Sequence, residues 1–265
     1  MPDRIPVTVA GASGRMGQAL FALLQDHPTL RLGACLERPG HPWLQGRAPD
    51  GIGGAILTDA LPEALAIAPV VLDFTAPQVS IDIARAASAC AAVHVIGTTG
   101  FDAAALEDLA TAGAGAVTVR AGNMSMGVNL LVQLTRRVAA ALGPEFDIEI
   151  VESHHRNKRD SPSGTALMLG EAAAAGRGVD IGHAAERARD GLCGPRGAGA
   201  IGFAVVRGGD IVGEHDVVFA GEGERLILRH VATDRTVFAR GALKAAEWAL
   251  QRPPGEYDML DVLGI

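Results

Sequence analysis

Short apolar runs alternate with helix-like stretches through the first 120 residues, and this alternation restricts the possible folds more than any other feature. The apolar runs have the length of buried strands and cover Ile5–Ala10, Leu30–Leu36, Val70–Phe74, Ala92–Ile96 and Ala116–Arg120. Apolar residues at helical spacing lie between them, at Gln18–Leu24, Val79–Ala89 and Ala103–Ala112. Successive strand–helix–strand units form right-handed crossovers, so the pattern predicts a parallel sheet.

The second half of the chain follows a different pattern. Gly127–Leu142 is a long apolar stretch at helical spacing, and we expect it to connect two bodies. Four strand-like stretches come after it, at residues 147–153, 200–206, 216–220 and 225–231. No long helix separates the last three, which predicts a mixed or antiparallel sheet. Residues 176–198 predict a long surface loop, and Val237–Leu250 predicts a closing helix.

Composition excludes several classes of protein. The 265 residues are 48% hydrophobic and carry a net charge of −7. This apolar content excludes a disordered chain, and no run reaches the ~18 apolar residues of a membrane span. Without a basic stripe, we expect neither a nucleic-acid nor a membrane partner. The start shows no signal-peptide pattern, and Cys35, Cys90 and Cys193 make neither a disulfide framework nor a zinc site. We expect a cytoplasmic protein with reduced, mostly buried cysteines.

A glycine-rich turn follows the first predicted strand, in the run Gly11-Ala12-Ser13-Gly14-Arg15-Met16-Gly17. Glycines permit a sharp turn close to a pyrophosphate, whose charge is favoured by the amides at a helix start. The spacing departs from the commoner G-x-G-x-x-G, and a tight turn without a ligand is the alternative. Glu37 ends the second strand, where an acid binds the adenosine ribose hydroxyls. The combination predicts a Rossmann-like dinucleotide-binding domain.

Arg38 bears on the choice of cofactor. An acid alone selects against a ribose 2′-phosphate, whereas a neighbouring arginine pairs with that phosphate or stacks on adenine. The adjacent Glu37 and Arg38 therefore predict the use of both NADH and NADPH. A solvated Arg38 without a ligand is the alternative.

Two further turns follow predicted strands, Gly97-Thr98-Thr99-Gly100 and Ala121-Gly122-Asn123-Met124. Open α/β sheets bind ligands at the carboxyl ends of their strands, and both turns belong to that edge. We expect their backbone groups and the side chains of Thr98, Thr99 and Asn123 to contact the ribose and carboxamide on the nicotinamide side. Taken singly, either sequence also fits an ordinary turn.

The densest polar stretch, Glu149–Ala166, leaves a predicted strand and enters a helix. We expect Ser161 to be the N-cap and Pro162 the first helical residue, where its missing N–H costs nothing. The amides of Ser163, Gly164 and Thr165 would then be unpaired donors at the positive end of the helix. Together with two hydroxyls they predict a cradle for a carboxylate or phosphate, although helices also begin this way without a ligand.

His154, His155 and Lys158 come shortly before this helix. A histidine exchanges a proton near neutral pH, and a lysine pairs with a carboxylate or acts as an acid. One buried structural histidine beside an exposed one is the alternative. Adjacent strand residues point to opposite faces, and no second Cys/His cluster completes a coordination shell, so we predict no metal.

The run Glu149–Ala166, E-I-V-E-S-H-H-R-N-K-R-D-S-P-S-G-T-A, resembles the signature of the dihydrodipicolinate reductase family of lysine biosynthesis. The resemblance covers nearly the whole chain and includes G-A-S-G-R-M-G, E-R, D-F-T, G-T-T-G-F, R-G-G-D-I-V-G-E-H at Arg207–His215 and the ending from Tyr257. Met124 and Ala76 depart from it, because some relatives carry Phe and Arg there. Ala76 removes a possible phosphate contact, which weakens any claim of NADPH preference.

The resemblance implies an α/β protein with two domains. The first is a Rossmann-like parallel-sheet domain that binds NADH or NADPH, covering residues 1–126 and completed by 237–265. The second is an α+β domain with a mixed open sheet, residues 127–236, that binds a small cyclic dicarboxylate and builds a homotetramer. The implied cofactor contacts are Gly11, Ala12, Ser13, Gly14, Arg15, Met16, Glu37, Arg38, Gly97, Thr98, Thr99, Ala121, Gly122, Asn123 and Met124.

The resemblance also implies catalytic roles. By motif, His154 is the proton donor and Lys158 its catalytic partner, while His155, Ser163, Gly164 and Thr165 hold the substrate carboxylates. The expected reaction delivers hydride to ring C4 of a conjugated imine and a proton from His154 to C3. Lys158 and the helix start stabilise the dicarboxylate as charge moves.

Two other functions compete with this one. Another Rossmann-type amino-acid oxidoreductase is possible, but a semialdehyde enzyme needs a nucleophilic cysteine, and none of the three cysteines has an adjacent histidine. A catalytically silent nucleotide-sensing module would keep the glycines and lose the proton donor, whereas His154 and Lys158 are both present.

Overall fold

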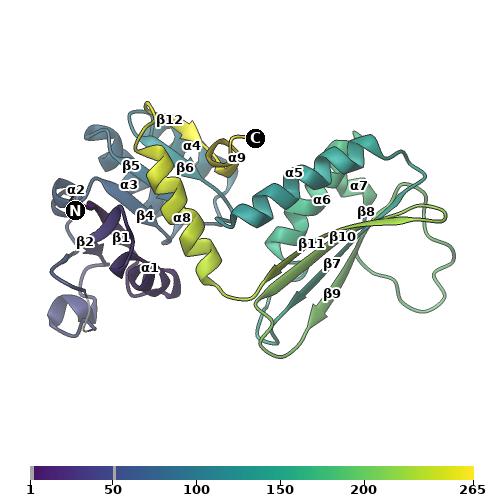
Figure 1. The fold of residues 1–265 in the computed structure, drawn as a ribbon, viewed down its shortest axis with the longest axis horizontal. Helices are drawn as coiled ribbons and strands as arrows, with labels where there is room; N and C mark the ends of the chain where they lie inside the picture. Colours follow the sequence, from purple (N-terminus) through teal and green to yellow (C-terminus); the bar gives the residue numbers. More distant parts are fainter. Residues whose placement is uncertain (1–2, 50–51) are drawn as a thin grey trace. The chain divides into compact units, whose positions relative to one another are not determined.

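The computed structural model describes residues 3–49 and 52–265. The contacts within it divide the chain into two compact units, which are described separately (Figure 1). The N-terminal unit comprises Met1–Met126 and Thr236–Ile265, and the C-terminal unit comprises Gly127–Arg235. In the described part of the chain, no helix has both the length and the apolar character needed to cross a membrane.

A parallel sheet forms the centre of the N-terminal unit, with the strand order β12-β6-β5-β4-β1-β2-β3. The strands are β1 (Ile5–Ala10), β2 (Leu30–Leu36), β3 (Ile56–Thr58), β4 (Val70–Asp73), β5 (Val93–Ile96), β6 (Val117–Arg120) and β12 (Gly255–Tyr257). Every residue of β4 and β5 is buried, as in sheets covered on both faces. The strand order reverses at β1, so the carboxyl ends of β1 and β4 flank the usual ligand position of this architecture.

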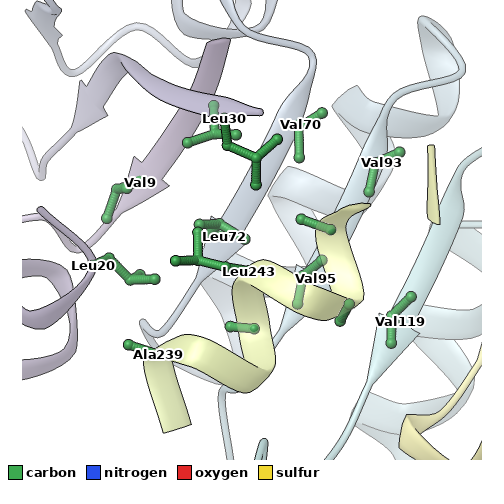
Figure 2. Close-up of a cluster of buried hydrophobic side chains, with 14 of the residues drawn as sticks. Val9, Leu20, Leu30, Val70, Leu72, Val93, Val95, Val119, Ala239 and Leu243 are labelled. Atoms are coloured by element: carbon green, nitrogen blue, oxygen red, sulfur yellow. The ribbon is translucent and has the colours of Figure 1, made fainter. Parts of the chain in front are cut away.

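Helices from both ends of the sequence cover this sheet. They are α1 (Arg15–Gln25), α2 (Leu61–Ile67), α3 (Pro77–Ala89), α4 (Ala103–Ala112), α8 (Thr236–Ala249) and α9 (Met259–Leu263), with a 3-10 helix, η1 (Pro42–Gln45). Figure 2 shows Leu243 of α8 against Leu72 and Val95 of the sheet, in one core cluster. The closing helix therefore completes the core of the N-terminal unit.

The C-terminal unit is built on a mixed open sheet in the order β11-β10-β7-β9-β8. Its strands are β7 (Asp147–His154), β8 (Ala185–Glu186), β9 (Ile201–Arg207), β10 (Gly213–Ala220) and β11 (Arg225–Ala232). β10 is antiparallel to β7 and β11, whereas β9 is parallel to β7 and β8. Together with the parallel sheet, this arrangement confirms the predicted α/β fold class.

Helices α5 (Met126–Ala141), α6 (Gly164–Arg177) and α7 (Ile181–Ala184) lie on one side of the C-terminal sheet in Figure 1. The residues of β7 and β10 alternate between buried and partly exposed, which is the period of a strand. The buried set packs with Leu169 of α6 in the core of this unit, and its largest members are Ile148, Ile150, Val217 and Phe219.

The opposite face of this sheet carries exposed apolar side chains. Val206, Ile227 and Val231 are 47%, 53% and 44% exposed. Ile227 pairs with Val218 and Val231 with Glu214, positions that alternate with the buried residues of β10. A solvated face of an antiparallel pair is ordinarily polar, so this apolar face is a feature to explain.

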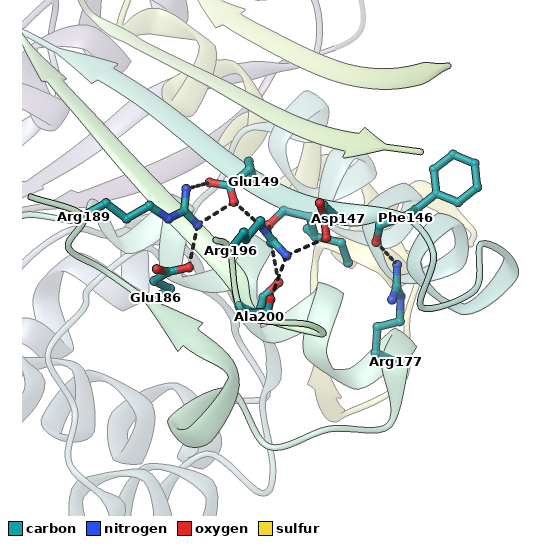
Figure 3. A network of polar contacts seen from close by, with 10 residues as sticks. Phe146, Asp147, Glu149, Arg177, Glu186, Arg189, Arg196 and Ala200 are labelled. Atoms are coloured by element: carbon teal, nitrogen blue, oxygen red, sulfur yellow. Dashed lines mark hydrogen bonds and ion pairs between the residues drawn. The ribbon is translucent and has the colours of Figure 1, made fainter. Parts of the chain in front are cut away.

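Two arginines anchor the long segment between β8 and β9 (Figure 3). Arg196 donates to the carboxylates of Asp147 and Glu149 at 2.7 and 2.9 Å, and to the carbonyl of Ala200 at 2.6 Å. Arg189 donates to Glu149 at 2.7 Å and to Glu186 at 2.7 Å. The segment is therefore fastened to the start of β7 by charge-assisted hydrogen bonds.

Several local expectations differ from the structure. The short elements β3, α2 and β12 were not predicted, and the predicted surface loop over residues 176–198 contains α7 and β8. Of the three cysteines only Cys35 is buried, so the expectation of mostly buried cysteines is wrong. Cys90 lies at the C-cap of α3 and Cys193 in the long segment before β9, both at the surface.

Candidate active site

The glycine turn between β1 and α1 has the geometry that its sequence predicts. Gly11 adopts φ +70°, and a β-carbon there would lie 3.2 Å from Thr75 Cγ2 and 3.3 Å from the Phe74 carbonyl oxygen. Gly14 is the N-cap of α1 and brings no side chain to the helix start. The first amides of a helix have no intrahelical acceptor, so this turn presents donors without side-chain obstruction. Arg15 is exposed there, and Met16 packs partly against the core.

Glu37 is bound to the same turn. Glu37 is 8% exposed, and its Oε1 accepts a hydrogen bond from the Ser13 amide at 2.5 Å. The contact fixes the position of the acid relative to the glycine turn. One carboxylate oxygen is thus used within the protein, while the other remains the candidate partner for a ribose hydroxyl.

A pocket of about 430 Å³ opens beside Glu37. Its lining includes Gly11, Leu36, Glu37, Arg38, Asp59, Thr75 and Asp82. Apolar walls with a few polar groups and a volume of hundreds of Å³ are typical of small-molecule sites. The pocket, the glycine at positive φ and the acid at the end of β2 together fit the adenosine part of a dinucleotide.

The two other predicted cofactor turns lie after β5 and β6, as expected. Thr98 is 5% exposed, and its hydroxyl accepts from the Thr75 amide at 2.9 Å and donates to Asp73 at 3.2 Å. Asn123 Oδ1 accepts from the Ser125 amide at 2.8 Å. Met124 is 2% exposed within the core cluster, whereas Thr99 and Gly122 are exposed. The side chains of Thr98 and Met124 therefore point into the interior of the N-terminal unit.

In the C-terminal unit, the alternation along β7 directs Glu152 and His154 to the buried face of the sheet. Glu152 is 1% exposed and His154 8%. His154 Nδ1 lies 2.6 Å from Glu152 Oε2. An ionised carboxylate only accepts hydrogen bonds, so Nδ1 carries the hydrogen and Nε2 is the atom left to exchange a proton.

Arg207, at the end of the neighbouring β9, holds Glu152 from the other side. Its two terminal nitrogens donate to Oε2 and Oε1 of Glu152 at 2.7 and 2.8 Å. Burial acts to raise the pKa of Glu152, but hydrogen bonds from Arg207, His154 and the Ser163 amide outweigh it and hold the pKa below its usual value. Glu152 is therefore a buried, ionised group.

The pKa of His154 reflects opposing influences. Burial lowers this pKa, and so do the charges of Lys158 and Arg207, whereas the hydrogen bond and charge of Glu152 raise it. The resulting pKa of His154 lies below the ordinary 6.5. A β-carbon on Gly213 would lie 3.1 Å from His154 Nε2, so the glycine keeps bulk away from that atom. A bound dianion would favour the protonated form of His154.

His215, on β10, is the second histidine of this cluster. Its Nε2 lies 3.0 Å from Ser163 Oγ, and its ring centroid lies 5.1 Å from that of His154. Burial first, and then the charge of His154, lower the pKa of His215 to about 4. His215 is thus neutral at pH 7 and lies beside the proton-exchanging ring.

The start of α6 differs from the prediction. The N-cap is Ser163 rather than Ser161, and Pro162 precedes the helix after a cis peptide bond with Ser161. Ser163 takes the extended N-cap conformation, and its hydroxyl accepts from the Ala166 amide at 3.2 Å. The Ser163 amide donates to Glu152 Oε1 at 2.9 Å, so the expectation of an unpaired amide there is wrong. Gly164, exposed at the first helical position, offers an amide without an intrahelical acceptor.

Lys158 and His155 lie in the turn that leaves β7. The Lys158 amide donates to the His155 carbonyl at 3.1 Å, and Lys158 Nζ lies 2.9 Å from Asp160 Oδ2. The Lys158 side chain is 20% exposed, so its cation is accessible from solvent. His155 is partly exposed after the strand has ended, and Thr165 is partly exposed in the first turn of α6.

Sequence analysis did not assign Glu152, Arg207 or His215 to the site. Arg207 and His215 are the first and last residues of the run R-G-G-D-I-V-G-E-H. This run resembles the family, but the resemblance assigned no role to either residue. The alternation of β7 also places Glu152 on the face of His154. In the described part of the chain, no group of three or more His, Cys, Asp or Glu side chains is arranged to hold a metal ion.

Comparisons with known proteins identify the family of the chain. Family models for the N-terminus and the C-terminus of dihydrodipicolinate reductase match residues 5–124 and 127–263. The chain belongs to the dihydrodipicolinate reductase family. The proteins named 4-hydroxy-tetrahydrodipicolinate reductase from Roseobacter denitrificans and Brucella abortus are 56% and 52% identical to it. These alignments cover 100% and 98% of this chain and 99% and 98% of the relatives.

Solved structures show the same fold. The dipicolinate-bound dihydrodipicolinate reductase from Paenisporosarcina sp. TG-14 matches with a TM-score of 0.79 at 24% identity, over 98% of this chain and 99% of that chain. Aspartate semialdehyde dehydrogenase II from Vibrio cholerae matches with a TM-score of 0.55 at 12% identity, over 92% and 98%. The resemblance to the dihydrodipicolinate reductase family is confirmed, and the chain is an oxidoreductase of that family.

Proposed function

We propose that the protein converts 4-hydroxy-tetrahydrodipicolinate to tetrahydrodipicolinate in the diaminopimelate route to lysine, by loss of water to dihydrodipicolinate and reduction of that compound. The observation that carries the proposal is the buried Glu152–His154 pair, in which Nδ1 is held at 2.6 Å and Nε2 remains for proton exchange. The high identity to proteins named for this reaction supports the same function. The proton from His154 goes to ring C3, next to the carbon that receives hydride.

The N-terminal unit is proposed to bind NADH or NADPH. The turn from Gly11 to Met16 receives the pyrophosphate, and Glu37 with Arg38 faces the adenosine ribose. When bound, the nicotinamide supplies a hydride to ring C4 of the substrate. The backbone of the turns at Gly97–Thr99 and Ala121–Met124 orients the nicotinamide side. We propose no metal cofactor.

The C-terminal unit is proposed to bind the cyclic dicarboxylate. Lys158, His155 and the first-turn groups of Gly164 and Thr165 contact its carboxylates, because cations and helix-start amides favour anions. Ser163 contributes by its backbone position, since its amide and hydroxyl bind Glu152 and His215. When substrate binds, Lys158 gives up its ion pair with Asp160 and pairs with a substrate carboxylate instead.

We also propose a homotetramer in the cytoplasm. The support for the assembly is the apolar outer face of the C-terminal sheet, where Val206, Ile227 and Val231 are exposed in the single chain. Burial of such a face between subunits removes apolar surface from water.

The test is oxidation of NADH and of NADPH, followed by absorbance, with substrate generated enzymatically from pyruvate and aspartate semialdehyde. We expect turnover that depends on both the substrate and the cofactor. Cofactor binding by calorimetry without any turnover would instead identify a nucleotide-sensing module. Turnover with aspartate semialdehyde alone would identify a different amino-acid oxidoreductase.

A further inference from the structure

A histidine and an aspartate are paired inside the N-terminal sheet and take no part in the proposed acid–base chemistry. His94, in β5, and Asp73, at the end of β4, are both 0% exposed. His94 Nε2 lies 3.1 Å from Asp73 Oδ2. His94 Nδ1 is buried without a hydrogen-bond partner among the described residues, so the ring donates through Nε2.

The other carboxylate oxygen of Asp73 accepts hydrogen bonds from residues of two turns. Oδ1 accepts from the Thr75 amide at 3.0 Å, from the Thr75 hydroxyl at 2.6 Å and from the Thr98 hydroxyl at 3.2 Å. The Thr75 amide also donates to Thr98 Oγ1 at 2.9 Å. Burial acts to raise the pKa of Asp73, but the hydrogen bond and charge of His94 and the hydrogen bond from Thr75 oppose it, and the pKa is lowered. Asp73 is therefore an ionised acceptor with His94 behind it.

Both turns reach the proposed cofactor site. Thr75 lines the pocket beside Glu37, and its Cγ2 lies 3.2 Å from the position of a β-carbon on Gly11. Thr98 belongs to the G-T-T-G turn at the nicotinamide side. A carboxylate that can rotate would release Thr75 and Thr98 together, because both hydroxyls use the same oxygen.

The neighbours of His94 on β5 are Val93 and Val95, which are ordinary residues for a strand buried on both faces. A histidine in this position leaves one ring nitrogen unpaired, which costs stability. Its one polar contact is made with the carboxylate that orders the cofactor turns.

We propose that His94 is a positioning residue for the cofactor, which acts through Asp73 to hold the Thr75 and Thr98 turns in their binding conformation. The proposal rests on the assignment of this edge of the sheet to NAD(P)H. His94 touches neither cofactor nor substrate. It fixes one oxygen of Asp73 so that the other stays directed at the two threonines.

The experiment compares His94→Leu with His94→Gln in the full-length protein. Leucine fills the space without a donor, whereas the glutamine amide replaces the Nε2 donor. Thr118→Val is the matched control, because Thr118 pairs with His94 in the sheet register, is 6% exposed and has a buried hydroxyl without a partner among the described residues. The readouts are the Kd for NADH by calorimetry, the KM for NADH and for the dicarboxylate, and kcat.

We expect His94→Leu to raise the Kd and KM for NADH about tenfold, equal to about 1.4 kcal/mol, while kcat and the KM for the dicarboxylate change little. His94→Gln restores most of the NADH affinity, and Thr118→Val leaves it unchanged. An unchanged Kd in a folded His94→Leu protein, or an equal loss in the leucine and glutamine variants, would overturn the proposal.

Thr98→Val provides a second arm, because it removes the hydroxyl that donates to Asp73 and accepts from the Thr75 amide. We expect weaker NADH binding and a double variant with His94→Leu that is no weaker than the worse single variant. Should His94→Leu not fold, wild-type NADH affinity in Thr98→Val overturns the proposal and a loss supports it. Failure of the wild-type protein to bind NADH or NADPH would refute the proposed cofactor function instead.

Discussion

Two adjacent histidines have different surroundings because a strand alternates and then ends. His154 is the last residue of β7 and faces Glu152, whereas His155 begins the turn that follows the strand. The carboxylate of Glu152 accepts hydrogen bonds from Arg207, His154 and the Ser163 amide. This carboxylate is the group that decides which nitrogen of His154 exchanges a proton.

Replacing Glu152 is therefore expected to change the pH dependence of the reaction. The negative charge of Glu152 raises the pKa of His154, so Glu152→Gln lowers that pKa further below 6.5. A general acid must be protonated, so kcat/KM falls as the pH rises through the pKa of His154. We expect this descending limb to move to lower pH in Glu152→Gln, with a loss of about tenfold at pH 7 for each unit of pKa.

Glu149→Gln is the matched control for that measurement. Glu149 lies on the other face of β7 and binds Arg189 and Arg196 (Figure 3). Its removal also breaks a carboxylate–arginine contact of the same strand but does not touch His154. A limb that stays in place in Glu152→Gln, or that moves equally in Glu149→Gln, would contradict the assigned role.

A second prediction for a single residue concerns the role of Arg38 in cofactor binding. The pocket lining described here contains the acids Glu37, Asp59 and Asp82 and one cation, Arg38. Arg38→Ala is expected to weaken NADPH binding by about 1–3 kcal/mol through loss of a charge-assisted phosphate contact, and NADH binding by less. Calorimetry with both cofactors measures the difference, with Arg31→Ala at the exposed start of β2 as control. Equal losses would mean that Arg38 stacks on adenine or has no specific role.

At the scale of elements, the apolar pattern was sufficient for several segments. The predicted strands β1 and β2 match the structure at both ends because they are short, mostly apolar runs, and α4 matches as well although only Leu109 in it is buried. β3 and β12 have three residues each, too few to show a period, and they lie at the two edges of the sheet. The start of α6 was misplaced because Ser161 and Ser163 both have N-cap chemistry, and only the contacts of Ser163 with Glu152 and His215 select between them.

His215 links β10 to the N-cap of α6, and its titration is expected to affect the stability of that contact. Its pKa is about 4 in the folded protein, because burial disfavours the imidazolium, and about 6.5 in the unfolded chain. The unfolded chain then binds more protons between these values, so stability is lost as the pH falls from about 6.5 to about 4, by roughly 2 kcal/mol at pH 5.

Urea unfolding at pH 7.5 and pH 5.0, at one protein concentration, measures this loss. His215→Gln keeps a polar partner for Ser163 but does not titrate, so we expect its free energy of unfolding to fall less between the two pH values. His183→Gln, on the exposed side of α7, is the control and should decline as the wild type does. A decline in His215→Gln as large as in the wild type would assign the acid sensitivity to other groups.

At the scale of the whole molecule, the site depends on contacts that local sequence does not reveal. Arg207 meets Glu152 across 55 residues of sequence, and His215 meets Ser163 across 52. Strand order brings them together, since β9 and β10 flank β7. Sequence analysis could thus name His154, Lys158 and the helix start from one continuous run, but not the residues that hold them.

The outer face of the C-terminal sheet leads to an expectation about assembly. Ile227 is 53% exposed in the single chain and lies among apolar neighbours of that face. Light scattering at micromolar concentration is expected to report a tetramer, and Ile227→Asp to dissociate it, because a charge cannot be buried there without a partner. Ile67→Asp, at a 41% exposed apolar position on α2, is the control and should remain tetrameric. A monomeric wild-type protein would contradict the proposed assembly.

His154 is proposed to donate the proton and the N-terminal unit to bind the cofactor, and steady-state kinetics of His154→Gln beside NADH calorimetry tests these roles most directly. We expect kcat to fall on the order of 10²–10⁴-fold, with little change in KM and an unchanged Kd for NADH. Lys158→Ala, measured in parallel, should lower kcat and also raise the KM for the dicarboxylate. A normal kcat in His154→Gln would contradict the proton-donor role. A loss of NADH affinity would show that this cluster takes part in cofactor binding instead.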